Sequence, residues 1–240
     1  MPAVGARGSL PPHKGKKMNL NYAKPDFYSR KAKDEGYVAR SIYKLKEIDE
    51  KFNLVKKNQH VLDLGSAPGS WAQYVSAIVG SSGKLVGVDY KEIKVAMPNT
   101  TFLVGNFFSD EIRQQLENLG PYDGIISDMA PDTVGDRVRD CFRSSDLTRK
   151  SLEFSYGYLK KGGYFICKIF QGGEEKEIME EMKKAFTAAH WFKPDSSRKI
   201  SFEIFLVGIG FIGKPDEENG ESEYQKFLAE SENNDGTMMW

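Results

Sequence analysis

The feature that most constrains the fold is a repeated alternation of strand-like and helical patterns between residues 60 and 208. Short apolar runs typical of strands lie at 60–64, 84–89, 101–104, 124–128, 164–170 and 202–208. Apolar residues recur at helical spacing near 70–79, 110–119, 141–159 and 174–189. Such alternation favours parallel strands joined by right-handed crossovers. We therefore expect a Rossmann-like, doubly wound α/β domain with a mostly parallel, seven-stranded sheet.

The 240 residues are expected to form one domain, residues 22–212, between two disordered extensions. Residues 1–21 are basic and rich in glycine and proline, and residues 213–240 are acidic and polar. A further amphipathic helix is expected over residues 34–52, where apolar side chains again recur at helical spacing. That helix carries Arg40, Lys44 and Lys46.

The formal net charge is zero, but the charges are unevenly distributed. Residues 1–57 contain 14 Lys and Arg against 6 Asp and Glu, whereas residues 214–240 contain 2 against 8. Phosphates are attracted locally, because salt screens charges over about 8–10 Å. The basic end could therefore bind nucleic acid, although a solvated charged segment is an equally good interpretation.

Several protein classes are disfavoured by the composition. No apolar stretch approaches the roughly 20 residues that span a bilayer, and the first residues lack the apolar core of a secretory signal. The two cysteines, Cys141 and Cys167, suggest neither a disulfide framework nor a metal cluster. We expect a cytoplasmic protein without a metal site.

Three charged residues lie in or directly after apolar, strand-like runs. Lys168 interrupts the run 164–170, Asp128 ends the run 124–128, and Glu203 lies inside the run 202–207. Burying an unpaired charge is costly, so such groups form pairs, bind ligands or shift their pKa. Functional sites concentrate such groups. For Asp128, capping the following turn is a structural alternative.

The segment 61–71 (VLDLGSAPGSW) leaves a strand, turns at Gly65 and Gly69, and enters a helix. Glycine permits close approach of a ligand, and the helix N-terminus offers free N–H groups. The dinucleotide fingerprint GxGxxG is absent, which disfavours an NAD-dependent oxidoreductase. Asp89 ends the next strand, where a carboxylate can accept from both ribose hydroxyls. This pattern fits a nucleoside cofactor without phosphates, namely S-adenosylmethionine.

Glycine in a strand-to-helix turn can also be purely structural, and Gly65 alone would not distinguish the two interpretations. The ordered combination with Pro68, Gly69, Trp71 and Asp89 favours the cofactor site.

The chain resembles the FtsJ/RrmJ-type family of ribose 2′-O-methyltransferases, represented in bacteria by the ribosomal RNA large-subunit methyltransferase E. Five segments, in order, carry this resemblance: 39–45 (ARSIYKL), 63–71 (DLGSAPGSW), 127–131 (SDMAP), 168–172 (KIFQG) and 193–198 (KPDSSR). The similarity covers roughly residues 22–212 and excludes both extensions. It implies a sheet of the class I S-adenosylmethionine-dependent methyltransferase type.

The resemblance also implies a catalytic tetrad formed by Lys44, Asp128, Lys168 and Glu203. Without it, Lys44 would be interpreted as a solvated helix lysine. The cofactor contacts implied by the family lie at Gly65, Gly69, Trp71, Asp89, Asn106 and Asp128.

Two positions depart from the family pattern. Asn106 stands where an aspartate is common, so we expect weaker binding of the adenine amino group. Ser70 replaces a common glycine and affects only the details of the turn.

The expected reaction is an in-line methyl transfer to a ribose hydroxyl, with Lys168 taking or steering the proton. Only RNA offers a 2′-hydroxyl, and a uridine of large-subunit (23S) ribosomal RNA is the acceptor that the resemblance implies. Expected phosphate contacts include basic residues of 1–57 and also Lys193, Arg198 and Lys199. Stacking on bases and packing on the core are equally good interpretations for Tyr22, Phe27 and Tyr28.

Two alternatives remain at this level. One is the same chemistry on a transfer RNA or an mRNA cap. The other is a non-catalytic, RNA-binding assembly factor, which a lysine within a strand core disfavours. We expect a monomer that acts on the assembled large subunit and does not associate with membranes.

Overall fold

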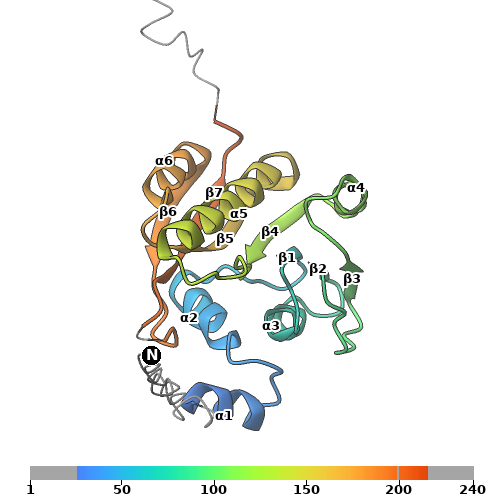
Figure 1. Cartoon of the computed structure of the whole chain (residues 1–240). Helices are drawn as coiled ribbons and strands as arrows, with labels where there is room; N and C mark the ends of the chain where they lie inside the picture. The colour runs from blue at the N-terminus through green and yellow to red at the C-terminus, as the bar shows by residue number, and fades with distance from the viewer. Residues whose placement is uncertain (1–25, 199, 216–240) are drawn as a thin grey trace, which may run out of the picture.

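The computed structural model describes residues 26–198 and 200–215. Within them, seven strands form one sheet in the order β3-β2-β1-β4-β5-β7-β6 (Figure 1). Neighbouring strands are parallel, except that β7 is antiparallel to both β5 and β6. The strands are β1 His60–Leu64, β2 Lys84–Asp89, β3 Thr100–Val104, β4 Tyr122–Ser127, β5 Leu159–Phe170, β6 Phe186–Phe192 and β7 Glu203–Phe211. The expected doubly wound, mostly parallel sheet is confirmed.

The sheet reverses its winding direction between β1 and β4. From β1 the chain moves outward through β2 and β3, then returns to β4 on the other side of β1 and continues to β5. Leu64 and Ser127 are paired at the carboxyl ends of β1 and β4. Gly65 and Asp128 therefore follow two adjacent parallel strands at the switch point, where doubly wound folds bind ligands.

The described residues form six helices (Figure 1). They are α1 Phe27–Asp34, α2 Ile42–Phe52, α3 Ser70–Val79, α4 Asp110–Leu119, α5 Arg137–Tyr158 and α6 Glu175–Ala185. Five of them pack on the sheet, and α1 packs against α2. Buried residues of α4, α5 and α6 pack on one face of the sheet. Buried residues of α2 and α3 pack on the opposite face.

Alternation along the strands determines which face each charged residue occupies. Tyr164 and Ile166 of β5 belong to the core under α2 and α3, whereas Phe165 and Cys167 face the other helices. Side chains two residues apart share a face, so Lys168 lies on the α2 face. The same reasoning places Glu203 there, because Phe205 and Val207 of β7 belong to that core.

Three expected helices are wrong in their extents. The helix expected over 34–52 begins only at Ile42, because α1 ends at Asp34 and Gly36 then adopts φ +79°. The helix expected over 174–189 ends at Ala185. In the other direction, α5 begins at Arg137, four residues earlier than expected, where the Asp136 side chain accepts from the N–H groups of Val138 and Arg139.

Strand β6 is the element that the sequence pattern did not locate. Its apolar residues Phe186, Ala189 and Phe192 also fit a helical spacing. In the structure this segment pairs antiparallel with β7, and Phe186 packs against Phe211. A long-range strand pairing therefore overrides the local pattern.

The predicted extensions 1–21 and 213–240 lie outside the described residues, apart from 213–215. Among the described residues, none of the helices is long and apolar enough to cross a membrane. The same part of the chain contains no group of three or more His, Cys, Asp or Glu residues that could hold a metal ion.

Candidate active site

The turn after β1 is built around Gly65, which adopts φ +76°. Its N–H donates to Val88 O at 2.9 Å, which ties the turn to β2. A Cβ on Gly65 would overlap the Met129 side chain and lie 3.3 Å from Met129 Cα. Glycine is therefore required here for both its backbone conformation and its small size.

A cavity of about 510 Å³ opens at the carboxyl ends of β1, β2 and β4. It is lined by Gly65, Asp89, Asn106 and Asp128 among the predicted cofactor residues. Phe107, Phe108, Met129 and Leu147 add apolar surface. Cavities of about 300–1,000 Å³ with a few polar groups are typical of small-molecule sites.

Asp89, at the end of β2, and Asn106, just after β3, both accept hydrogen bonds from backbone N–H groups. Asp89 accepts from Ala67 N–H at 3.0 Å and from Lys91 N–H at 2.9 Å. Asn106 Oδ1 accepts from Phe108 N–H at 2.9 Å. These bonds fix both side chains at the cavity wall, and each oxygen retains further acceptor capacity.

Gly69 and Trp71 lie beside the turn and are not among the residues that line this cavity. Gly69 adopts φ +109° directly before α3. The Trp71 side chain is buried, its indole N–H donates to Ser41 O at 2.8 Å, and its ring packs near Phe205. Trp71 thus connects α3 to the segment that begins α2, and its cofactor contact stays a prediction.

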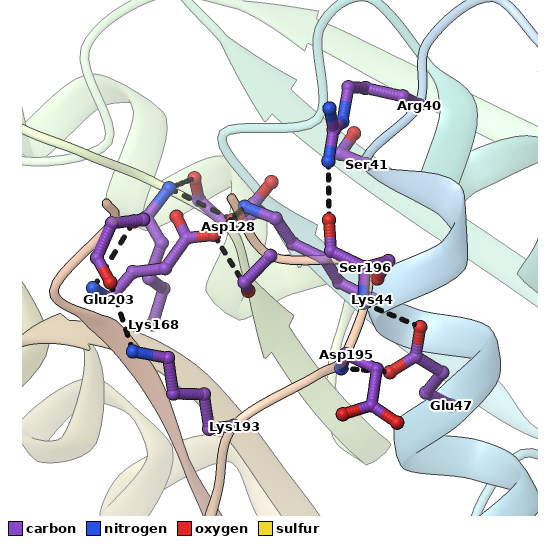
Figure 2. A network of polar contacts seen from close by, with 12 residues as sticks. Arg40, Ser41, Lys44, Glu47, Asp128, Lys168, Lys193, Asp195, Ser196 and Glu203 are labelled. Carbon is purple, nitrogen blue, oxygen red and sulfur yellow. Dashed lines mark hydrogen bonds and ion pairs between the residues drawn. The ribbon is translucent and has the colours of Figure 1, made fainter. Parts of the chain in front are cut away.

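The four predicted catalytic side chains converge on the α2 face of the sheet (Figure 2). Lys168 Nζ lies 2.9 Å from Asp128 Oδ1 and also donates to the Asp128 carbonyl oxygen. Lys44 Nζ lies 2.7 Å from Glu203 Oε1 and 3.7 Å from Asp128 Oδ1. Two ammonium groups and two carboxylates therefore alternate along one continuous path.

The tetrad is largely removed from water. Its side chains are between 7% and 18% exposed, with Lys168 the most buried. Buried charges are tolerated when each is paired and hydrogen-bonded. Asp128 also lines the cavity, so it connects the ion-pair path to the glycine turn.

Ser197 extends this path and was not singled out from the sequence. Its hydroxyl donates to Glu203 Oε1 at 2.9 Å, and the residue is 9% exposed. It belongs to the segment 193–198 that carries part of the family resemblance. Ser197 contacts Glu203 only because this loop folds back onto β7, and a local sequence pattern does not predict such a tertiary contact.

Asp63 is a further buried carboxyl beside the site. It is 1% exposed, and Oδ2 has no hydrogen-bond partner among the described residues. Burial, together with the negative charges of Asp128 and Asp89, raises the pKa of the Asp63 carboxyl well above its usual range. Asp63 could have been found in the same way as Lys168, because it too is a charged residue inside an apolar, strand-like run.

A second cavity, of about 260 Å³, lies on the α2 side of the tetrad. Lys44 and Glu203 line it together with Arg40, Ser41, Arg198 and Ser201. The tetrad is therefore reached from two cavities, the first through Asp128 and the second through Lys44 and Glu203.

The residues predicted to contact RNA differ in how exposed their side chains are. The Arg198 side chain is 59% exposed, whereas Lys193 Nζ donates to Ser201 O at 2.9 Å. Phe27 is 64% exposed, and Tyr28 packs against Tyr43. Tyr22 and Lys199 lie outside the described residues.

Comparisons with known proteins identify the family. The model of a family described as FtsJ-like methyltransferase matches residues 37–211. A protein of Treponema denticola named ribosomal RNA large subunit methyltransferase E is 42% identical over 194 residues, covering 80% of this chain and 98% of the relative. A protein of the same name from Desulforapulum autotrophicum is 46% identical over 188 residues, covering 77% and 92%.

Solved structures show the same fold. A Plasmodium falciparum protein described as a ribosomal RNA methyltransferase matches with a TM-score of 0.66 and 31% identity, covering 74% of this chain and all of that one. Fibrillarin from Aeropyrum pernix, solved with S-adenosyl-L-methionine, matches with a TM-score of 0.50 and 19% identity, covering 70% and 76%, which supports the fold alone. The chain belongs to the FtsJ-like methyltransferase family.

Proposed function

We propose that this protein transfers a methyl group from S-adenosylmethionine to the 2′-hydroxyl of a uridine in large-subunit (23S) ribosomal RNA. The observation that carries the proposal is the convergence of Lys44, Asp128, Lys168 and Glu203 beside the cavity of the glycine turn. The names of the relatives support ribosomal RNA of the large subunit as the substrate.

The residues of the larger cavity fit S-adenosylmethionine. Gly65 leaves space that a side chain would fill, and the Asp89 carboxylate can accept from ribose hydroxyls. Asn106 and Phe108 offer an amide and an aromatic surface to a base, and the Asp128 carboxylate suits a cationic amino group. Bound S-adenosylmethionine supplies an electrophilic methyl group on a sulfonium.

We assign Lys168 the role of taking or steering the proton that the acceptor hydroxyl loses. Its Nζ is held by two oxygens of Asp128, so two of its donor directions are used and a third can reach a hydroxyl. A neutral Lys168 would act as a base, and a charged Lys168 would stabilise the developing alkoxide.

Lys44 and Glu203 are assigned to positioning the acceptor. Both line the smaller cavity, where Arg40 and Arg198 supply positive charge suited to phosphates. Both guanidinium groups also contact the Asp26 carboxylate, so a phosphate would share or replace that partner. The 2′-hydroxyl of a ribose held in this cavity would have to reach past Lys44 to Asp128, which lines the cofactor cavity. Holding the reacting atoms about 3 Å apart and in line can supply much of the rate enhancement.

We also propose that the protein acts as a monomer in the cytoplasm on RNA within the assembled large subunit. One chain supplies both cavities and all four tetrad side chains, so a second copy is not needed to complete the site.

The test is methyl transfer from labelled S-adenosylmethionine to three acceptors: unmodified large subunits, naked ribosomal RNA and transfer RNA. We expect the large subunit to be labelled fastest, with the label on a ribose 2′-oxygen after nuclease digestion. Preferential labelling of transfer RNA or of an mRNA cap would overturn the substrate. Absence of transfer to any RNA, with S-adenosylmethionine bound, would support the assembly-factor alternative.

A further inference from the structure

The loop of residues 193–202 joins β6 to β7 and carries the Ser197 hydroxyl that contacts Glu203. Its described residues form no helix or strand, and Ile200 is 80% exposed. Within the loop, Ser197 N–H donates to Pro194 O at 3.0 Å and Ser201 N–H donates to Arg198 O at 2.8 Å. These turns shape the loop locally, whereas its position on the protein depends on contacts with other elements. The contacts that hold it therefore determine where Ser197 lies.

Glu47 of α2 binds the backbone of this loop with both carboxylate oxygens (Figure 2). Its Oε2 accepts from Asp195 N–H at 2.6 Å, and its Oε1 accepts from Ser196 N–H at 3.0 Å. Arg40, two residues before α2, donates to the Ser196 carbonyl oxygen. The backbone of Ser196 is thus fixed at its N–H and its carbonyl group.

These contacts form a closed ring with the catalytic tetrad. Glu47 follows Lys44 by three residues on α2, so both side chains lie on neighbouring positions of one helix surface. The ring runs from Glu47 through the loop backbone to Ser197, then to Glu203, and returns to α2 at Lys44. A displacement of the loop would therefore be transmitted to the Glu203 carboxylate and to Lys44.

We propose that Glu47 is a positioning residue for methyl transfer, which acts by holding Ser197 against Glu203 and thereby orienting Lys44. This role rests on the proposed function. Both carboxylate oxygens of Glu47 accept from loop backbone N–H groups, so Glu47 acts through the loop and not by touching cofactor or acceptor.

The first test compares three purified variants in single-turnover methyl transfer to unmodified large subunits. Glu47→Ala removes both acceptor oxygens, and its transfer rate at saturating substrate should fall by at least about tenfold, because displacements near 1 Å can cost roughly a hundredfold. Glu47→Gln keeps one acceptor oxygen and should be intermediate. Glu50→Ala changes an exposed carboxylate of the same helix and should match the wild type. S-adenosylmethionine affinity should stay within about twofold in all three, because a positioning role leaves ground-state cofactor binding unchanged.

The second test combines Glu47→Ala with Ser197→Ala. If Glu47 and Ser197 act through the same loop contact with Glu203, the double variant should be no slower than the slower single variant. Multiplicative losses, or an unchanged rate in Glu47→Ala, would overturn the proposal. If Glu47→Ala does not fold, Glu47→Gln and Ser197→Ala provide the same comparison. A wild-type protein without transferase activity would instead overturn the proposed function itself.

Discussion

Replacing Gly65 with alanine should damage the cofactor site in a way that the structure allows us to estimate. Gly65 adopts φ +76°, a conformation that costs an ordinary residue roughly 1–2 kcal/mol. The new methyl group would overlap the Met129 side chain, and overpacking of this kind costs about 1–3 kcal/mol. The two contributions together predict a loss of about 2–5 kcal/mol in the free energy of unfolding.

Gly36 provides a matched control for the backbone contribution. It adopts φ +79°, but a Cβ at this position would meet nothing within 4 Å. Gly36→Ala should therefore lose only the backbone contribution, roughly 1–2 kcal/mol. Urea unfolding of both variants measures the difference, which should be about 1–3 kcal/mol.

Cofactor affinity is the second measurement on the same pair of variants. Gly65 and Met129 both line the cavity, so displacing Met129 should weaken S-adenosylmethionine binding by about tenfold or more, equivalent to about 1.4 kcal/mol. Gly36→Ala should bind the cofactor as the wild type does. If calorimetry shows equal affinities, and unfolding shows equal stabilities, the assignment of this turn as a tight cofactor cradle is refuted.

Two further predictions concern single side chains. Asn106→Asp should tighten S-adenosylmethionine binding by several-fold, because a carboxylate makes a charge-assisted hydrogen bond to the adenine amino group; calorimetry showing equal or weaker binding would contradict this. Burial, with the positive charges of Lys84 and Lys160, lowers the pKa of His60 below its ordinary value of 6.5. The unfolded chain therefore binds this proton first, so stability should fall as pH drops below about 6.5 and level off below the folded pKa. His60→Gln should reduce that pH dependence in urea unfolding, and an identical pH profile would remove His60 as its cause.

Much of the site could be predicted from the sequence because strands impose a period of two. Lys168 and Glu203 interrupt apolar runs, and their positions within β5 and β7 place them on one face of the sheet. Asp128 directly follows β4, and the glycine turn follows the neighbouring β1. The sheet topology then brings these residues together at the switch point.

Other parts of the site depend on tertiary contacts that no local pattern encodes. Lys44 resembles a solvated helix lysine until α2 packs against the sheet beside β7. Ser197 and Glu47 acquire roles only because the β6–β7 loop folds back onto α2. The first residues of β6 fell within the helix expected over 174–189, because the pairing of β6 with β7 is not visible in the local apolar spacing.

The central claim is that four side chains act as one methyl-transfer site beside the cofactor. Its most direct test is the single-turnover transfer rate of Lys168→Ala, with S-adenosylmethionine affinity measured on the same sample and the exposed Lys176→Ala as control. We predict that Lys168→Ala loses transfer by at least about a hundredfold, the lower range for a general acid–base residue, and retains cofactor affinity. A transfer rate equal to that of Lys176→Ala would contradict the account.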